Sequence, residues 1–311
     1  MSIRILATSP LVGGHLQDLG RRFPELAVLP FRSPEWDAAL AEAEALVVLV
    51  SQPLTEADLA RAPRLRALGT YSVGMNHLPL AACEARGIPI ASTPGVLTEA
   101  TADMALALVL AVARRMAEGE ALVRSGAWQG WAPDQLLGTG LDGKTCGILG
   151  SGPIGRAFAR RAWACGMLPC FWDREGSGVE VDFGPGSAPR LPLEELLARS
   201  AVLSVHCPLT PATKGLLGLA QLAALPPGAI LVNTARGGIL DEPAAMELLR
   251  SGHLGGVGLD VYEGEPNLHP GWMEAPRTVL LPHLGSATRE ARDGMASLLC
   301  SGLAEILCRA E

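Results

Sequence analysis

The sequence predicts an α/β fold made of two domains, each with a parallel β-sheet. Short apolar runs alternate with helical segments from the N-terminus onwards, a pattern typical of parallel sheets covered by helices. A glycine-rich turn at residues 150–155 stands between an apolar run and an Ala-rich helical segment. Polar residues then follow four apolar runs in the second half of the chain. A length of 311 residues leaves room for two such domains.

The composition narrows the class of protein. Apolar residues make up 49% of the chain and charged residues 18%, which excludes general disorder. A net charge of -7 argues against a nucleic-acid partner, since phosphate binding needs a basic surface. The most apolar run, residues 104–113, is too short to span a bilayer, and we expect no signal peptide. Seven scattered cysteines form no CxxC pair, which predicts reduced thiols, a cytoplasmic protein and no metal site.

In the first part of the chain, predicted strands alternate with predicted helices. Strands are predicted at residues 3–6, 26–31, 45–50, 65–71 and 88–90, and helices at residues 36–43, 55–62 and 80–86. Because helices separate the strands, the sheet that they form should be parallel.

A Pro-Gly turn at residues 94–95 interrupts this alternation. A single long Ala/Leu-rich helix is predicted after it, from residue 98 to about residue 120, as a crossover between domains. We expect Thr98 to be its N-cap, with Glu99 or Thr101 supporting the first turn. Residues 123–143 follow without a regular pattern, and a loop this long is expected to pack on a neighbouring domain or a partner subunit.

The glycine turn has the spacing of a dinucleotide-binding motif. Gly150, Gly152 and Gly155 follow the apolar run 146–149 and precede a helical segment at 157–165. The first glycine permits the tight turn, the second lets the backbone approach a pyrophosphate, and the third lets the helix pack closely on the strand. The sequence therefore predicts that this turn binds a dinucleotide.

An acidic residue ends the next apolar run, residues 167–172. Asp173 stands where a carboxylate would receive the ribose hydroxyls of NAD. It would repel a 2′-phosphate, so NAD(H) is the preferred cofactor. Arg174 can pair with a phosphate, which keeps NADP(H) possible.

Four further strands are predicted after a Gly/Pro-rich surface stretch that reaches residue 187 and a helix at 193–198. They lie at residues 201–206, 229–233, 255–261 and 278–281. Ligands bind at the carboxyl ends of parallel strands, so the residues at those ends are candidate site residues. They are Cys207, Pro208, Thr234, Ala235, Arg236, Asp260 and His283.

Hydride transfer with a nicotinamide needs a proton donor or acceptor, a cation for the substrate carboxylate, and a group that orients the acid/base. His283 at a strand end is the candidate acid/base, the alternative being a structural histidine. Arg236 ends an apolar strand, where an anionic ligand explains a guanidinium better than solvent does. Spacing does not choose between Glu263 and Glu265 as the partner of His283, and a surface turn is the alternative for both.

Seven stretches of the chain together resemble one family. The chain is similar to the D-isomer-specific 2-hydroxyacid dehydrogenases and, among them, to the glyoxylate/hydroxypyruvate reductase branch. The resemblance covers nearly the whole chain. The matching stretches are residues 72–74, 92–103, 143–145 with the glycine turn, 206–210, 232–238, 258–266 and 282–288.

The resemblance implies a catalytic set of Arg236, Glu265 and His283, which selects Glu265 over Glu263. In that family pattern His283 exchanges the proton at the C2 oxygen and Glu265 orients the imidazole. Arg236 binds the carboxylate and polarises the carbonyl, and the backbone of Ser72, Val73 and Gly74 completes the substrate site. The glycine turn, the strand ends and the resemblance together assign the cofactor to Thr101, Gly150, Gly152, Pro153, Ile154, Gly155, Asp173, Arg174, Cys207, Pro208, Thr234, Ala235 and Asp260.

The resemblance also implies the architecture and the reaction. Residues 1–98 would form a flavodoxin-like substrate domain, residues 99–286 a Rossmann domain that binds NAD, and residues 287–311 a helix that returns to the substrate domain. A homodimer would form through the cofactor domain, with the long helix and residues 128–138 reaching the partner. The expected reaction is the reversible reduction by NAD(P)H of a small 2-keto acid, glyoxylate or hydroxypyruvate in class, to its D-2-hydroxy acid.

Some positions depart from the family pattern. Gln135 stands where related reductases often have an aromatic residue, which puts a substrate contact across the dimer in doubt. His77 is expected at the rim of the substrate pocket rather than as a substrate ligand. A phosphoglycerate-type dehydrogenase is an alternative, as is a non-catalytic scaffold or corepressor that senses NAD on the same fold. Formate-oxidising relatives have glutamine where Glu265 stands, and phosphite-oxidising relatives have lysine where Val73 stands.

Overall fold

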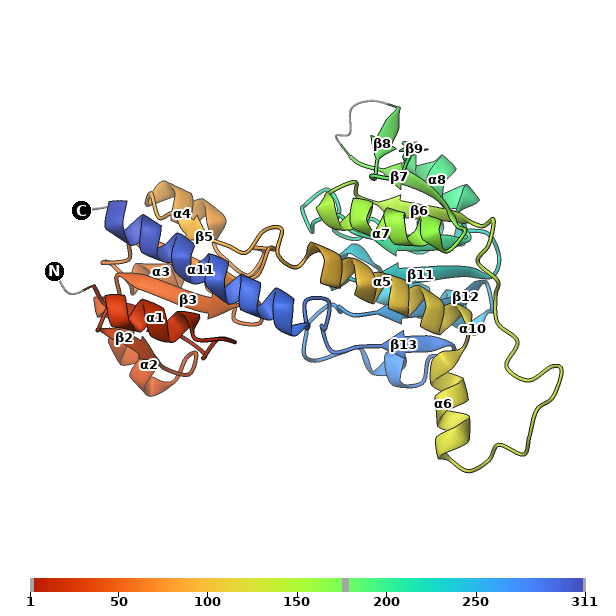
Figure 1. Cartoon of the computed structure of the whole chain (residues 1–311), viewed down its shortest axis with the longest axis horizontal. Helices are drawn as coiled ribbons and strands as arrows, with labels where there is room; N and C mark the ends of the chain where they lie inside the picture. The colour runs from red at the N-terminus through yellow and green to blue at the C-terminus, as the bar shows by residue number, and fades with distance from the viewer. Residues whose placement is uncertain (1–2, 175–178, 310–311) are drawn as a thin grey trace. The chain divides into compact units, whose positions relative to one another are not determined.

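The computed structural model describes residues 3–174 and 179–309 (Figure 1). The chain divides into two compact units. The first consists of Met1–Leu97 together with Ala287–Glu311, and the second of Thr98–Ser286.

Among the described residues, the first unit has a five-stranded parallel sheet. Its strand order is β2-β1-β3-β4-β5, which is the flavodoxin-like order expected of this part of the chain. Every predicted strand is present, most of them shorter than expected. The strands are β1 (Ile5–Ala7), β2 (Leu26–Val28), β3 (Ala45–Leu49), β4 (Ala67–Tyr71) and β5 (Ile90–Ala91).

Helices cover this sheet. Thr55 caps one of them through a capping box with Asp58, so that helix begins one residue later than expected. The last helix in the chain packs against β4. It also lies beside the first helix (Figure 1). The sequence did not predict the helix at His15–Arg22. The helices are α1 (His15–Arg22), α2 (Pro34–Ala39), the 3-10 turn η1 (Leu40–Glu42), α3 (Glu56–Ala60), α4 (Leu80–Ala85) and α11 (Arg289–Arg309).

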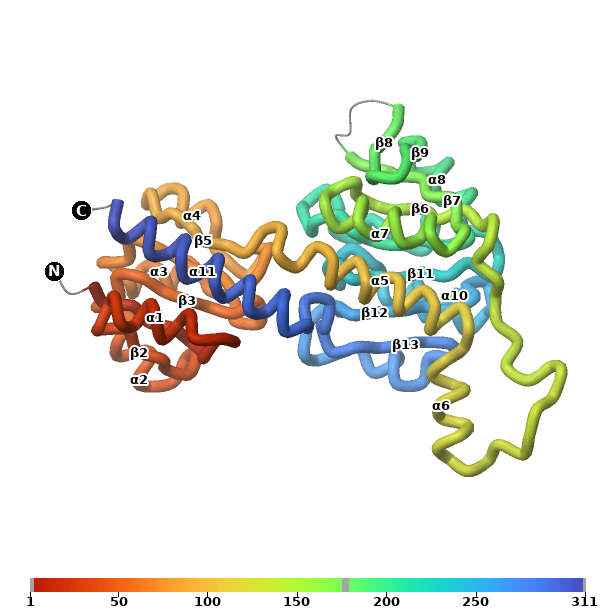
Figure 2. Tube along the Cα trace, viewed as in Figure 1, coloured from red at the N-terminus to blue at the C-terminus, as the bar shows by residue number. Residues whose placement is uncertain are grey.

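The second unit has, in its described part, a six-stranded sheet in which every pairing is parallel. The strand order is β13-β12-β11-β10-β6-β7, with β6, β7, β11, β12 and β13 labelled in Figure 2. From β6 the chain first adds β7 on one side and then β10 and the later strands on the other, so the topological switch point lies between β6 and β10. Open α/β sheets bind ligands at such a switch point. The strands are β6 (Thr145–Leu149), β7 (Leu168–Trp172), β10 (Val202–Val205), β11 (Ala229–Asn233), β12 (Leu254–Leu259) and β13 (Thr278–Leu280). The predicted fold class, two parallel-sheet α/β domains, is confirmed.

Two apolar cores hold the helices of this unit to its sheet. One core joins the sheet to α5 and α7 through side chains such as Leu108 and Phe158. The other joins it to the remaining helices through side chains such as Leu196, Leu222 and Ala245. These helices are α5 (Thr98–Ala113), α7 (Pro153–Ala164), α8 (Leu193–Arg199), α9 (Leu219–Ala223) and α10 (Glu242–Arg250).

The single helix predicted from residue 98 to 120 is wrong. Helix α5 ends at Ala113, Arg115 adopts a left-handed conformation with φ 53°, and α6 (Met116–Arg124) starts afresh. The carbonyl of Ala113 accepts a hydrogen bond from the N–H of Thr139, so it is taken from the helical ladder by the returning loop. Thr98, expected as the N-cap, is instead the first helical residue.

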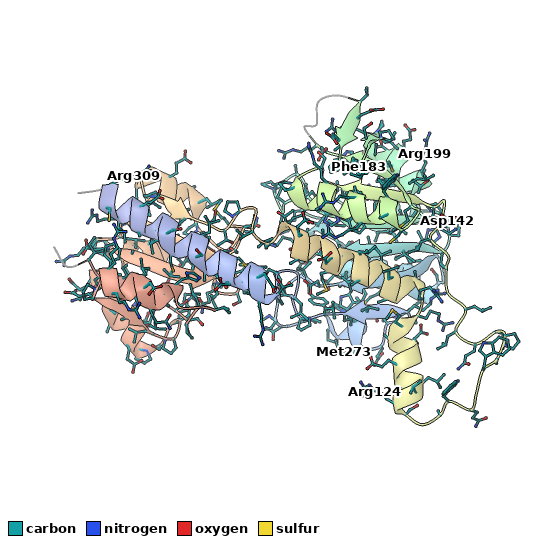
Figure 3. The ribbon with its side chains drawn as sticks, in the orientation of Figure 1. Arg124, Asp142, Phe183, Arg199, Met273 and Arg309 are labelled. Atoms are coloured by element: carbon teal, nitrogen blue, oxygen red, sulfur yellow. The ribbon has the colours of Figure 1, made fainter. Side chains whose placement is uncertain are left out.

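The Gly/Pro-rich stretch up to residue 187, expected to lie on the surface, contains most of a hairpin that is partly buried. Strands β8 (Glu180–Asp182) and β9 (Ser187–Pro189) pair antiparallel, and Val181, Phe183 and Ala188 are buried against the rest of the unit. Phe183 is labelled in Figure 3. Residues 175–178 of that stretch lie outside the described residues.

None of the helices among the described residues is long and apolar enough to cross a membrane.

Candidate active site

The glycine turn follows β6 at the switch point of the second sheet. Gly150 has φ +105°, and a β-carbon on it would lie 2.8 Å from the backbone nitrogen of Cys207. A β-carbon on Gly155 would lie 2.0 Å from the carbonyl oxygen of Gly150, so helix and turn touch there. Glycine is required at both positions.

The N-terminus of α7 suits an anion. Gly152 is its N-cap and makes no side-chain cap bond, and Pro153 occupies the first turn. A β-carbon on Gly152 would meet no atom within 4 Å, so a ligand has room to approach the backbone there. The N–H groups of the first helical turn, including that of Ile154, therefore suit a pyrophosphate.

Asp173, directly after β7, lies beside the glycine turn. One carboxylate oxygen accepts a hydrogen bond from the N–H of Ser151 at 2.6 Å. The other accepts a bond from Nε of Arg190 at 3.1 Å. Asp173 is thus held where the resemblance expects a ribose ligand, but it already forms an ion pair with a residue that the sequence did not single out.

Other predicted cofactor residues follow β10 and β11. Thr234 is 8% exposed, and its Oγ1 is buried without a hydrogen-bond partner among the described residues. A bound ligand would supply one. Burial raises the pKa of Cys207 to about 11, so its thiol stays protonated at neutral pH and serves as a packing group.

Asp260 fixes the turn that carries His283. It is fully buried, and its two oxygens accept hydrogen bonds from the N–H groups of Leu284 and Gly285, both at 2.6 Å. His283 has φ 58°, a left-handed conformation that costs free energy in a residue with a β-carbon. The two bonds to Asp260 hold the backbone in this conformation, and a β-carbon on Gly285 would lie 3.4 Å from Thr101.

His283 forms a charged hydrogen bond with Glu265 and not with Glu263. The distance from Nδ1 of His283 to Oε2 of Glu265 is 2.8 Å. The other oxygen of Glu265 accepts a bond from the N–H of Tyr262, also at 2.8 Å. Burial alone would raise the pKa of Glu265, but these bonds and the charges of His283 and Arg236 hold it below its ordinary value. The carboxylate is therefore ionised at neutral pH.

Arg236 places a positive charge near the carboxylate of Glu265. Burial lowers the pKa of Arg236, while the negative charge of Glu265 partly offsets that effect. A guanidinium nevertheless stays positively charged at neutral pH. Its guanidinium donates to the carbonyl of Ala235 at 2.6 Å. A half-buried cation of this kind favours an anionic ligand.

The predicted substrate residues of the first unit form their own network. The hydroxyl of Ser72 donates to the carbonyl of Gly74 at 2.7 Å and contacts Thr70 at 2.8 Å. His77, expected at a pocket rim, contacts Thr70 through Nε2 at 2.8 Å. Val73 is exposed.

Sequence reasoning missed Glu242. It is 3% exposed, and its carboxylate accepts bonds from the N–H of Glu263 and from Nε1 of Trp272, both at 2.7 Å. A β-carbon on Gly237 would lie 1.9 Å from the carbonyl carbon of Tyr262. The segments that carry Arg236 and Glu265 are therefore locked together. Asp241-Glu242-Pro243 indicates a helix start in the sequence, but nothing there signals a buried acceptor.

The described residues contain no group of three or more His, Cys, Asp or Glu side chains that could hold a metal ion.

The fold and site define an α/β protein with a dinucleotide-binding unit and a His-Glu pair at its strand ends. A family model described as "D-isomer specific 2-hydroxyacid dehydrogenase, NAD binding domain" matches residues 106–285. The chain belongs to the D-isomer specific 2-hydroxyacid dehydrogenase family. It is accordingly an enzyme, an oxidoreductase with a NAD-binding domain.

Individual relatives agree with this assignment. A glyoxylate reductase of Thermococcus litoralis is 43% identical over 267 residues, which is 84% of this chain and 80% of that protein. A glycerate dehydrogenase of Hyphomicrobium methylovorum is 39% identical over 254 residues, 81% of this chain and 79% of that protein. A crystal structure of a protein from Thermus thermophilus superposes with a TM-score of 0.90 at 43% identity, covering 99% of this chain and 97% of that one.

Removal of the Glu242 carboxylate should destabilise the protein. In Glu242→Ala the N–H of Glu263 and Nε1 of Trp272 would lose their buried acceptor, at about 1–3 kcal/mol for each unsatisfied group. Urea denaturation should show a loss of at least about 2 kcal/mol in the free energy of unfolding. The exposed Glu247, on the same helix, offers a matched control whose replacement by Ala should change stability little. Equal stabilities of the two variants would contradict this account.

His206 should make stability sensitive to acid. Burial lowers its pKa to about 3; Nε2 bonds to Ser204, the ring packs on Phe158, and Nδ1 is buried without a partner among the described residues. The unfolded chain takes up a proton near pH 6.5 and the folded chain does not, so this contribution to stability is complete above pH 6.5 and falls as pH drops towards 3. Between pH 7 and 5 the loss should be about 1–2 kcal/mol.

The variant His206→Gln keeps a bond to Ser204 but cannot take up the proton. Urea midpoints measured at both pH values should fall less in the variant than in the wild type. The same fall in both proteins would mean that other groups cause the acid sensitivity.

Proposed function

We propose that the protein uses NAD(P)H to reduce a small 2-keto acid of the glyoxylate or hydroxypyruvate class to its D-2-hydroxy acid, reversibly. The observation that carries this proposal is the 2.8 Å hydrogen bond between Nδ1 of His283 and Oε2 of Glu265. The positive charge of Arg236 also acts on Glu265 and helps to lower its pKa. The glyoxylate reductase and glycerate dehydrogenase names of the relatives support the substrate class.

In this mechanism His283 is the proton donor for reduction. Glu265 accepts the bond at Nδ1, which leaves Nε2 to donate a proton to the C2 oxygen of the substrate. The ionised Glu265 stabilises the positive charge of the imidazolium before the proton leaves. A reduced nicotinamide, when bound, would supply the hydride to C2, so that one hydride and one proton convert the ketone to an alcohol.

Arg236 binds the substrate carboxylate and withdraws electron density from the adjacent carbonyl. A guanidinium forms two parallel bonds with a carboxylate, which would fix the orientation of a small substrate. On the motif resemblance, backbone N–H groups of Val73 and Gly74 are proposed to bind the carboxylate as well.

The cofactor would be held by the glycine turn, the first turn of α7 and the residues at the strand ends. The N–H groups near Gly152 and Ile154 would bind the pyrophosphate, Asp173 the ribose, and Thr234 would use its unpartnered hydroxyl. NAD(H) is proposed as the preferred cofactor and NADP(H) as a possible one.

We also propose a cytoplasmic homodimer. All seven cysteines, each among the described residues, are free thiols, as suits a reducing compartment. Helix α6 and the segment after it project from the second unit (Figure 1). Large apolar side chains are exposed along them, which favours an interface. They are Met116, Val123, Trp128, Trp131 and Leu137.

Loss of the imidazole should abolish most turnover. In His283→Ala, kcat for glyoxylate or hydroxypyruvate reduction should fall by about 10²–10⁴-fold, the usual contribution of a general acid. NADH binding, followed by fluorescence titration, should survive. His15→Ala, at a histidine on α1, is the control and should keep normal turnover. Near-normal turnover in His283→Ala would contradict the proposed role.

A panel of 2-keto acids would separate this function from the non-catalytic alternative. Tight NADH binding by the wild-type protein without turnover of any member would favour the scaffold.

The dimer should depend on Trp131, the more exposed of the two tryptophans in the loop. Trp131 is 83% exposed, and interface tryptophans often contribute much of the binding free energy. In Trp131→Ala, light scattering over a dilution series should show dissociation at concentrations at least about tenfold higher than in the wild type. Trp163 on α7 is 50% exposed, and its replacement by Ala is the matched control. A wild-type monomer, or dissociation in the Trp163 variant alone, would refute this interface.

A further inference from the structure

Arg190 meets the carboxylate that would select the cofactor. Its Nε lies 3.1 Å from Oδ2 of Asp173, and the two side chains are only 13% and 20% exposed. The other oxygen of Asp173 accepts the N–H of Ser151 in the glycine turn at 2.6 Å. The ion pair is therefore largely withdrawn from water, next to the place where an adenosine ribose would bind.

The hairpin holds Arg190 in this position. It directly follows β9, forms a parallel bridge with Phe171 of β7, and donates its N–H to the carbonyl of Val179. Leu191 in turn donates its N–H to the carbonyl of Phe171. The backbone on both sides of Arg190 is thus fixed beside the strand that ends at Asp173.

The ion pair changes how Asp173 would affect the choice between NAD and NADP. A lone carboxylate accepts the two ribose hydroxyls of NAD and repels the 2′-phosphate of NADP. A guanidinium bonded to that carboxylate cancels its charge and is itself the side chain best suited to a phosphate. The carboxylate oxygens keep lone pairs for the ribose hydroxyls, because each oxygen can accept two bonds.

We propose that Arg190 is the residue that sets the cofactor preference, and that through it the site accepts NADPH as well as NADH. Arg190 offsets the charge of Asp173 and contacts the 2′-phosphate when NADPH binds. This inference rests on the proposed use of a nicotinamide dinucleotide at the glycine turn, but not on which keto acid is reduced.

Direct binding measurements test the proposal without turnover. Fluorescence titrations of the full-length protein with NADH and with NADPH give both dissociation constants. Wild-type protein should bind both nucleotides. In Arg190→Ala, the dissociation constant of NADPH should rise by about tenfold or more, the typical effect of losing a charged hydrogen bond, and that of NADH by less than about threefold.

Substitution of the other member of the ion pair gives a second, independent test. Asp173→Asn keeps an acceptor for Ser151 but removes the negative charge that pairs with Arg190 and would repel a 2′-phosphate, so the preference should move towards NADPH by about tenfold or more. In the double variant Asp173→Asn/Arg190→Ala this shift should disappear. A shift of the same size with and without Arg190 would overturn the proposal.

A control variant and the remaining outcomes distinguish a failure of the Arg190 proposal from a failure of the proposed dinucleotide binding. Arg199 on α8, labelled in Figure 3, pairs with Glu195 on the same helix, and Arg199→Ala removes the same charge. It should leave both dissociation constants unchanged. Wild-type protein that binds NADH but not NADPH, or equal weakening of both nucleotides in Arg190→Ala, would overturn the role of Arg190. Wild-type protein that binds neither would overturn the dinucleotide function itself.

Discussion

Parallel alignment of the strands in the second unit is the constraint on which its site depends. Because β6, β7, β10, β11, β12 and β13 all run in one direction, the residues that follow them reach the same edge of the sheet. The order reverses between β6 and β10, and there Gly150 lies so close to Cys207 that a side chain would not fit. Residues widely separated in the chain, such as Asp173 and Asp260, thereby belong to one edge.

Two buried carboxylates that accept hydrogen bonds then fix the loops that carry His283 and Glu265. Asp260 accepts two backbone N–H bonds and Glu242 accepts one from the backbone and one from an indole. Buried acceptors of this kind are stable only while every bond is made, so each holds its loop in one conformation. The first fixes the turn of His283 and the second fixes the loop of Glu265. The 2.8 Å bond between these two side chains depends on both.

Sequence patterns predicted what repeats locally and missed what depends on distant contacts. Apolar runs located the parallel strands, and the glycine spacing located the turn, because both are determined by residues close together in the chain. The break after Ala113 was missed because its cause, the N–H of Thr139, lies far along the chain. Arg190 and Glu242 were missed for the same reason: a surface-type residue in a turn and a helix-start glutamate become site residues only when tertiary structure brings their partners.

Two ion pairs in the second unit show that the chemical role of a carboxylate depends on the side chain with which it pairs. Glu265 pairs with His283, a group that can lose its proton, so in the proposed mechanism the negative charge of Glu265 supports proton transfer. Asp173 pairs with Arg190, a group that keeps its proton, so the positive charge there persists and offsets the carboxylate. An acid at the end of the second Rossmann strand therefore does not determine the cofactor by itself. In the proposed binding mode the sum of the charges around the ribose does, and Arg190, which directly follows the neighbouring hairpin, enters that sum.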